Sequence, residues 1–304
     1  ATGQNSFRER YLNDVKRYNI EVDFESVIAP PPAVLDLKLT NVCNLKCRMC
    51  GPTASSSILK EQKRLGKKFG ADEVYWLKNK IIGTENEDLF FNEWVPNMKS
   101  LELTGGEPFV SLENKKLIAK IVESGHSEHI DILITTNGTH YNKKLMNDVE
   151  SFKYANLSIS IDDFGPRLEY ARSGANWDLI KSNILKFKTH DVKLKAYVTV
   201  NNYNIWHLKE IESEFSDIGL PIVYGFLHEP EALSIKYLNS HIKERIVEKY
   251  SDGNKRFSFI LDFLDASEDD HTINLYRHIR EYDEMRTENF DETFEEWAEV
   301  IMYV

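Results

Sequence analysis

The chain has 304 residues, of which 41% are hydrophobic and 29% charged, enough for one large core or one core plus an appendage. Its net charge of −11 argues against a partner bound mainly through phosphates, so nucleic acid is not an expected partner. No window approaches the roughly 18 apolar residues of a membrane span, and the first residues lack the basic start and apolar run of a signal peptide, so no membrane partner is expected.

The predicted elements begin with a helical lead-in over residues 1–33, which ends at Pro30-Pro31-Pro32. Short segments rich in Ile, Leu and Val then predict strands at Val34–Leu39, Ser100–Thr104, Ile130–Thr135, Asn156–Ile161, Lys193–Val200 and Ile222–Leu227. Apolar residues at three- and four-residue spacing predict helices at Ser55–Phe69, Leu112–Ser124, Asn142–Phe152, Asn176–Thr189 and Ile205–Phe215. Strands separated by helices pair in parallel, which predicts an α/β fold with a (β/α)6 partial TIM barrel over residues 34–229, open on one side.

Two segments fall outside this alternation. Residues 75–98 are predicted to form an insertion near the active face, and its aromatic residues are candidates for substrate recognition: Tyr75, Trp76, Phe90, Phe91 and Trp94. Residues 230–304 form a predicted acidic helical C-terminal region, with helices at Ser240–Tyr250, Phe257–Leu264, Thr272–Asp283 and Phe290–Tyr303. This region either covers the open side of the barrel or binds a partner, and we favour the first.

The loop after the first strand contains all three cysteines of the chain, Cys43, Cys47 and Cys50, in a C-x3-C-x2-C pattern. An odd number of cysteines argues against a disulfide framework and predicts a reducing compartment, the cytoplasm. Three thiolates suit a cubane iron–sulfur cluster, whose four irons normally take four cysteines, so one iron would stay open for a ligand. A zinc site with a distant His is an alternative. Another is three structural cysteines, which Lys46 and Arg48 disfavour because charged side chains resist burial.

This spacing resembles the signature of the radical S-adenosylmethionine (SAM) superfamily. The resemblance implies a [4Fe–4S] cluster on the three cysteines, with the amino and carboxylate groups of SAM on the open iron. It also implies reductive cleavage of SAM to a 5′-deoxyadenosyl radical that abstracts hydrogen from a substrate, with electrons from a flavodoxin- or ferredoxin-like donor. It places Met49, the residue before the third cysteine, against adenine, where its polarizable side chain can pack.

Gly105, Gly106, Glu107 and Pro108 follow the second strand. Paired glycines let the backbone approach a ligand, the proline fixes the turn, and the glutamate offers a carboxylate to an ammonium group. The same residues would also suit a plain strand-to-helix turn. Next to the cysteine loop they resemble the GGEP motif of the superfamily, which implies that they bind the amino group of SAM.

Polar residues also follow the third and fourth strands. Asn137 lies in an Asn-Gly turn, while Ser158, Ser160 and Asp162 alternate and therefore share one face. Buried hydroxyl groups need partners, which polar atoms of SAM can provide. The resemblance implies that Asn137 faces the cluster cavity, that Ser160 and Asp162 contact SAM, and that Arg172 binds its carboxylate. An ordinary turn and an exposed helix-end arginine are the alternatives.

The last two strands give weaker signals. The resemblance implies that Asn202 contacts the ribose or methionine of SAM and that Leu227 touches adenine, although ordinary strand-end roles fit equally well. The similarity extends over about residues 34–229 and is greatest to the twitch/SPASM-related group, in Cys43–Cys50 and in Glu229–Leu233. No cysteine follows Cys50, so no second Cys-bound cluster is expected in this chain.

The sequence therefore predicts an oxygen-sensitive radical SAM enzyme that acts on a peptide or small-molecule substrate. Two alternatives come from other classes of protein. A non-catalytic iron–sulfur protein for electron transfer or sensing would have a fully ligated cluster. A zinc-stabilised binding module would contain zinc and no iron.

Overall fold

The computed structural model describes residues 7–21, 30–70, 80–251, 255–267 and 269–302. At its centre six parallel strands form a sheet in the order β1-β3-β4-β5-β7-β8. Their bounds are Val34–Leu37 (β1), Ser100–Leu103 (β3), Asp131–Thr136 (β4), Tyr154–Ser160 (β5), Lys193–Val200 (β7) and Ile222–Phe226 (β8). The order in the sheet follows the order in the chain, and among the described residues β1 and β8 do not pair with each other. The predicted (β/α)6 partial barrel with a helical C-terminal extension is confirmed.

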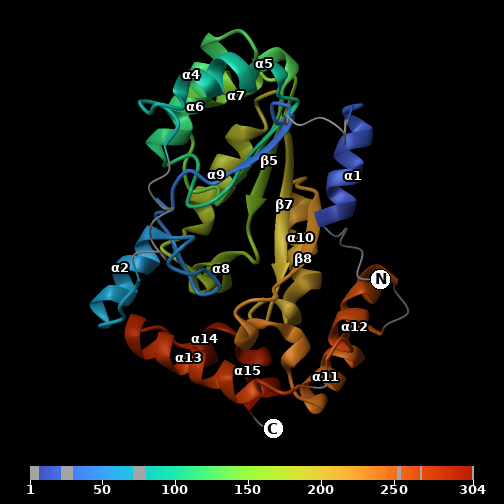
Figure 1. The fold of residues 1–304 in the computed structure, drawn as a ribbon. Coiled ribbons are helices and arrows are strands. Elements are labelled where there is room, and N and C mark those ends of the chain that lie inside the picture. The colour runs from blue at the N-terminus through green and yellow to red at the C-terminus, as the bar shows by residue number, and fades with distance from the viewer. Residues whose placement is uncertain (1–6, 22–29, 71–79, 252–254, 268, 303–304) are drawn as a thin grey trace.

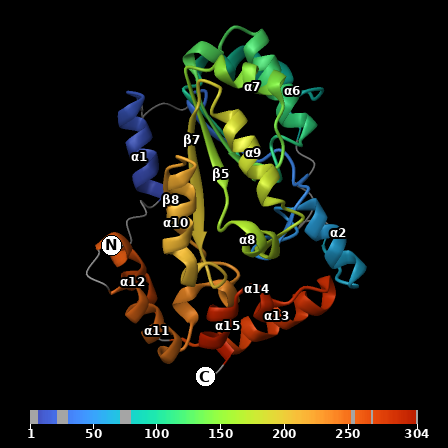
Figure 2. The same cartoon turned by 180° about the vertical axis from the view of Figure 1, so that it is seen from behind.

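Four helices cover one face of this sheet: α6 (Leu112–Glu123), α7 (Lys143–Glu150), α9 (Trp177–Phe187) and α10 (Leu208–Asp217). Figure 2 shows α7, α9 and α10 on the near side of the strands. The helices begin where the sequence supplies a cap, because the side chains of Ser111, Asn142 and Asn176 accept hydrogen bonds from the first turns of α6, α7 and α9. Each helix turns an apolar stripe toward the sheet, where residues such as Leu103 and Ile159 are fully buried.

The other face of the sheet is polar. The register aligns Thr135 on β4 with Ser158 on β5 and Lys195 on β7, and Lys38 and Thr104 follow directly after the paired ends of β1 and β3. The next residue of each strand points the opposite way into the helix-covered core, as Ala196 does. The inward face of the barrel is therefore lined by hydroxyl and charged groups instead of a packed apolar interior.

A short antiparallel ladder joins two loops at the carboxyl ends of the strands. In it β2 (Lys46–Cys47) pairs with β6 (Arg172–Ser173), so that Cys47 lies opposite Arg172. The helix α2 (Ser56–Arg64) follows the first of these loops, and α8 (Gly165–Ala171) leads into the second. Neither this ladder nor α8 was expected from the sequence, because two-residue strands and a seven-residue helix give no periodic signal.

The N-terminal helix α1 (Phe7–Arg17) lies within the segment predicted as a helical lead-in. Arg17, its last residue, forms an ion pair with Asp131 at 2.9 Å, and the hydroxyl of the next residue, Tyr18, donates to the same carboxylate at 2.8 Å. Asp131 is the first residue of β4, so α1 is fastened at the amino ends of the strands, away from the two joined loops.

The described part of the insertion, residues 80–98, lies at the end of the barrel opposite to the one predicted. Its described part consists of α4 (Glu87–Leu89), a π-helical turn η2 (Phe90–Trp94) and α5 (Val95–Asn97), while Tyr75 and Trp76 lie outside the described residues. Because α5 leads directly into β3, this part lies near the amino ends of the strands, and Glu87 pairs with Lys120 near the end of α6. The placement near the active face is therefore wrong for residues 80–98.

Among its described residues, the C-terminal region contains five α-helices besides short 3-10 turns: α11 (Ser240–Tyr250), α12 (Ser258–Leu264), α13 (Thr272–Arg286), α14 (Phe290–Thr293) and α15 (Glu295–Met302). Figure 1 shows α13, α14 and α15 beyond the arrowhead of β7, at the opposite end of the barrel from α4 and α5. Trp297 of α15 stacks on Trp206 with ring centroids 5.2 Å apart and donates to the backbone oxygen of Asn202 at 2.6 Å. These three helices thus lie across the carboxyl ends of the strands. We had expected them to cover the open side of the barrel instead.

Within the described ranges, no helix combines the length and apolar character that crossing a membrane would require.

Candidate active site

The cysteine loop lies at the carboxyl end of β1 and is held by three serines at the start of α2. The Ser55 hydroxyl donates to the backbone oxygen of Leu45, and the Ser57 hydroxyl donates to that of Cys43, both at 2.7 Å. The Ser56 hydroxyl accepts the Cys43 amide at 3.2 Å. Polar partners for an irregular backbone are needed wherever a loop is shielded from water, so these serines fix the path of the loop.

The three thiols are neighbours. All three are free, Cys47 is buried, and Cys43 and Cys50 are half-buried. Cys47 and Cys50 share a hydrogen bond, which lowers the pKa of the Cys50 thiol and raises that of the Cys47 thiol. The pKa of Cys43 is raised, chiefly by burial. Two nitrogens face the sulfurs from other loops, since Nη1 of Arg172 lies 3.8 Å from Sγ of Cys47 and Nδ2 of Asn137 lies 3.9 Å from Sγ of Cys43.

This donor set fits an iron–sulfur cubane better than a single metal ion. Among the residues that the structure describes, no three His, Cys, Asp or Glu side chains converge on one point as ligands of a single ion would. In a cubane each cysteine binds a different iron, so the sulfurs need only surround the cluster, and N–H groups near them are typical of such sites. The three thiols with the flanking Arg172 and Asn137 meet this requirement.

Gly106 brings the turn after β3 against the start of the cysteine loop. Its φ is +57°, and a Cβ there would lie 2.5 Å from the backbone oxygen of Val42 and 2.9 Å from the carbonyl carbon of Asn41. The amide of Glu107 donates to the Val42 oxygen at 2.8 Å. Only glycine permits both this conformation and this approach, so the two motifs are in direct backbone contact.

Replacing Gly106 with alanine is expected to lower the free energy of unfolding by about 2–5 kcal/mol. Left-handed backbone costs a residue with a side chain about 1–2 kcal/mol, and the clash adds roughly 1–3 kcal/mol. Gly66→Ala is the matched control, because Gly66 also has a positive φ, +79°, but a Cβ there meets no atom within 4 Å. Urea unfolding of both variants measures the difference. Equal losses would show that the backbone contact beside Val42 is not tight.

Glu107 lies inside the protein. Only 1% of it is exposed, and its carboxylate accepts hydrogen bonds from the Thr136 hydroxyl and the Asn137 amide, both at 2.6 Å, and from the Phe109 amide at 2.9 Å. Burial raises the pKa of Glu107 above its ordinary value, although these donors oppose the rise. A carboxylate has about four acceptor positions. Three donors already bind the Glu107 carboxylate and hold the end of β4, so about one acceptor position is left for another donor.

Asp162 and Arg172, two of the predicted SAM contacts, are paired with each other. Nε and Nη2 of Arg172 approach one carboxylate oxygen of Asp162 at 2.9 and 2.7 Å, and the other oxygen accepts the Thr199 amide at 2.9 Å. Both residues are buried. Arg172 therefore links the end of β5 to the cysteine loop across the β2–β6 ladder, and the alternative of an exposed helix-end arginine is wrong.

The other predicted site residues are spread over the same end of the barrel. Asn137 also donates to Asn44 at 3.1 Å, which ties it to the cysteine loop, and Ser160 lies half-buried on the inward face. Met49 and Leu227 are half-buried against the core. Asn202 is buried beneath α15, and its side-chain amide donates to the backbone oxygen of Ala232 at 3.1 Å. Asn202 is therefore enclosed by the C-terminal region.

The sequence interpretation missed three residues. Arg48, expected to resist burial, is 1% exposed because carboxylates from the C-terminal region surround its guanidinium. Lys195 and Tyr197 lie half-buried on the inward face of β7, and neither side chain bonds to another described residue. Both could have been predicted from the sequence, because polar and apolar residues alternate strictly over Lys193–Val200 and so place Lys195 and Tyr197 on the polar face of the strand.

A cavity of about 610 Å³ runs along the outer strand β1. Asp36 of that strand and Lys38 just after it line the cavity, together with Lys80, Phe90 and Trp94 of the insertion. The Lys38 side chain also lies against Gly105, where it occupies the space that a Cβ would take.

The chain is thus a parallel partial barrel that carries three free thiols and the buried Asp162–Arg172 pair at the carboxyl ends of its strands. Residues 37–215 match the family described as the Radical SAM superfamily, so the chain belongs to that superfamily. The prediction of an enzyme of this superfamily is confirmed at the level of the family.

Curated relatives include enzymes. A GTP 3′,8-cyclase of Mannheimia succiniciproducens is 30% identical over 146 residues, which are 47% of this chain and 36% of that protein. A GTP 3′,8-cyclase of Staphylococcus carnosus is 25% identical over 213 residues, 59% of this chain and 58% of that protein. An uncharacterized protein of Methanocaldococcus jannaschii is 25% identical over 218 residues, which are 69% of this chain and 68% of that protein. The chain thus spans between about a third and three fifths of the two cyclases.

Solved structures are similar at lower identity. The protein anSMEcpe with bound AdoMet and the Kp18Cys peptide is 17% identical, with a TM-score of 0.48 over 66% of this chain and 52% of that chain. Streptococcus suis SuiB bound to S-adenosylmethionine is 17% identical, with a TM-score of 0.45 over 80% of this chain and 48% of that chain.

Proposed function

We propose that this chain holds a [4Fe–4S] cluster on Cys43, Cys47 and Cys50, cleaves SAM reductively and abstracts hydrogen from a peptide or small-molecule substrate. The observation that carries the proposal is the set of three neighbouring free thiols at the carboxyl end of β1, in a chain with no fourth cysteine. One iron of a cubane held there has no cysteine of this chain, and an open metal position is where a ligand binds.

The surrounding residues have tasks that follow from their contacts. Arg172 and Asn137 direct N–H groups at two of the sulfurs and so orient the thiolates. Gly105 and Gly106 give the backbone close access to the amino group of SAM, and Glu107 holds the end of β4 in place beside them. The proposed SAM contacts are completed by residues from the remaining strand ends: Met49, Pro108, Ser160, Asp162, Asn202 and Leu227.

When bound, the cluster and SAM supply a one-electron cleavage that generates a 5′-deoxyadenosyl radical. A buried arginine paired with a carboxylate keeps its charge, and Arg172 can therefore offer Nη1, the nitrogen not used by Asp162, to an anionic group such as the methionine carboxylate. The proposed electron donor is a flavodoxin- or ferredoxin-like protein of the cytoplasm, where thiols stay reduced.

We place the substrate in the polar interior of the barrel. Lys195 and Tyr197 present an ammonium and a phenol group there without partners among the described residues, next to the hydroxyls of Ser158 and Thr135. Lysines are seldom left unpaired inside proteins, so a polar substrate is the natural partner. Such a substrate agrees with relatives whose names include GTP, and a peptide with an acidic side chain would offer the same chemistry. A kinship with the twitch/SPASM-related group belongs to the same proposal.

Replacing Lys195 with methionine is expected to leave the free energy of unfolding within about 0.5 kcal/mol of the wild type, because no pairing partner is lost. Turnover of the substrate should fall, while SAM cleavage without substrate should continue. Lys193→Met is the control, since Lys193 lies on the same face of β7 but is exposed at its start. The measurement combines urea unfolding with the 5′-deoxyadenosine yield. A loss of several kcal/mol would assign Lys195 a structural task instead.

The proposed function is tested by anaerobic reconstitution with iron and sulfide, followed by reduction in the presence of SAM. The enzyme should form 5′-deoxyadenosine, and the electron paramagnetic resonance (EPR) spectrum of the reduced cluster should change when SAM is added. A fully ligated cluster that SAM does not perturb would favour an electron-transfer or sensing protein. A colourless protein that contains zinc would favour a binding module.

A further inference from the structure

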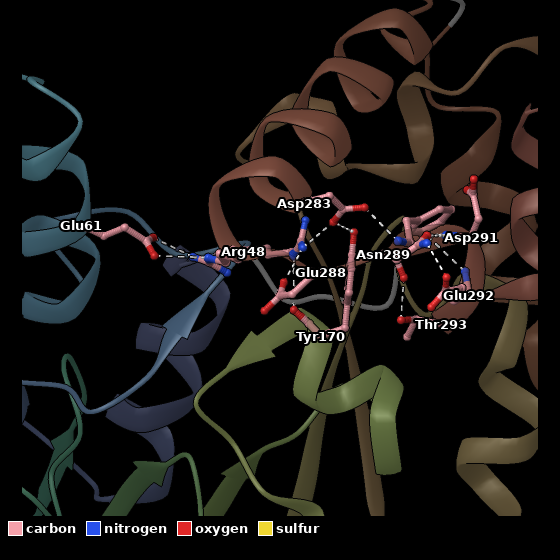
Figure 3. Close-up of polar contacts among 11 residues, drawn as sticks. Arg48, Glu61, Tyr170, Asp283, Glu288, Asn289, Asp291, Glu292 and Thr293 are labelled. Atoms are coloured by element: carbon pink, nitrogen blue, oxygen red, sulfur yellow. Dashed lines mark hydrogen bonds and ion pairs between the residues drawn. The ribbon is translucent and has the colours of Figure 1, made fainter.

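Arg48 lies between Cys47 and Met49, yet its side chain points away from the barrel into the C-terminal region. Nη2 of Arg48 lies 2.7 Å from Oδ1 of Asp283 on α13 and 2.5 Å from Oε2 of Glu288 just after α13. Figure 3 shows the guanidinium of Arg48 among these carboxylates, with Tyr170 beside them. The arginine side chain is 0% exposed, whereas those of its partners are 18% and 23% exposed. The contact therefore buries a charge beside the proposed ligands.

The same guanidinium also contacts the end of α8. Nε of Arg48 donates to the backbone oxygen of Tyr170 at 3.2 Å, and the guanidinium carbon Cζ lies 3.6 Å from the centre of the Tyr170 ring. The Tyr170 hydroxyl donates to Asp283 at 2.6 Å, and the Arg48 amide donates to the Ala171 oxygen at 2.8 Å. Arg172 follows directly, so one buried group joins the cysteine loop, the segment before Arg172 and α13.

A second ion pair fastens the other side of the loop. Glu61 on α2 accepts Nη2 of Arg286, from the last turn of α13, at 2.8 Å and Nζ of Lys46 at 3.0 Å. The Arg286 side chain is 3% exposed. The cysteine loop and the helix that follows it are thus both attached to α13, through residues more than two hundred positions away along the chain.

The cost of these pairs indicates a positioning task. Burying an ion pair rarely stabilises a protein more than apolar residues of similar volume would, whereas removing one partner is strongly destabilising. An apolar side chain at position 48 could pack on Tyr170, but it would not bind two carboxylates and fix their distance from Cys47. The arrangement therefore defines geometry at the loop more than it adds stability.

We propose that Arg48 is a positioning residue which, with Asp283, Glu288 and Tyr170, fastens α13 over the cysteine loop, so that the C-terminal helices form part of the cofactor site. The inference rests on the proposed function, since the position of the loop matters to chemistry only where the loop holds the cluster. In this proposal, residues 272–288 hold Cys47 in its position opposite Arg172.

Hydrogen–deuterium exchange of the cluster-free protein tests the contact without any cofactor. Arg48→Met and Glu288→Gln should each speed exchange of the amides of residues 43–50, by on the order of tenfold for the first and less for the second. Arg256→Met is the matched control. It removes another ion pair between the C-terminal region and the barrel, to Glu212 at 2.6 Å, and should leave residues 43–50 unchanged.

The reconstituted protein supplies the second readout. Arg48→Met should lose iron several times faster than the wild type and show an altered EPR spectrum of the reduced cluster, and Arg48→Lys should recover part of both. Should Arg48→Met fail to fold, the partly exposed Glu288→Gln decides. Unchanged exchange of residues 43–50 in the folded variants would overturn the positioning role and leave the proposed function intact. A wild-type cluster that ignores SAM would overturn the proposed function while leaving the exchange result standing.

Discussion

Replacing Cys47 with alanine is expected to abolish reductive cleavage of SAM. Cys47 is the most buried of the three thiols, lies opposite Arg172 in the β2–β6 ladder and shares a hydrogen bond with Cys50. With two thiolates left, the loop cannot retain a cubane, so the loss should exceed the roughly 10–100-fold that removing an outer partner of a metal site costs. The measurement is 5′-deoxyadenosine formed by the reconstituted, reduced protein, together with the iron bound per chain.

Val42→Ala provides the matched control for this variant. Val42 directly precedes the cysteine loop, the residue is 43% exposed, and its backbone contacts to Gly106 and Glu107 do not depend on the side chain. It should retain both iron and activity. If Cys47→Ala still bound iron and formed 5′-deoxyadenosine at the wild-type rate, a cluster held by these three cysteines would be ruled out.

Local patterns in the sequence were enough to predict the barrel. The strands rich in Ile, Leu and Val and the capped helices lie within a few residues of their predicted bounds, because a side-chain period of two or 3.6 depends only on neighbouring residues. The predicted helix that should have reached Phe69 ends at Arg64, with Leu65 as its C-cap and Gly66 next at a positive φ of +79°. Its end could have been read from that glycine.

The contacts that hold the site together could not be predicted in this way. Asp162 and Arg172 were each assigned to SAM, and their mutual pairing depends on the turn that brings β6 beside the cysteine loop. The partners of Arg48 lie 235 and 240 positions away, a separation at which no local pattern operates. The insertion was misplaced because aromatic content gives no direction, whereas its junction with β3 fixes it at the amino ends of the strands.

Replacing Arg172 with methionine is expected to lower the free energy of unfolding by about 3–5 kcal/mol. The change leaves the Asp162 carboxylate, 1% exposed, without the cation that it accepts two hydrogen bonds from. Breaking one side of a buried ion pair costs about this much, because the remaining charge has lost its compensation. Denaturant unfolding of the cluster-free protein measures the loss, and the EPR response of the reduced cluster to SAM measures the effect on cofactor binding.

The double variant Arg172→Met with Asp162→Asn separates the two tasks of the pair. Asparagine removes the uncompensated charge, and its side-chain oxygen can still accept the Thr199 amide, so most of the lost stability should return. The response to SAM should stay absent, because the guanidinium that faces Cys47, and that we propose binds the methionine carboxylate, is still missing. A double variant that recovered both stability and the response to SAM would show that Arg172 acts only within the fold. Recovery of stability alone would show that Arg172 is needed for the cofactor and not for the fold. The charge of Asp162 would then be required only to neutralise Arg172.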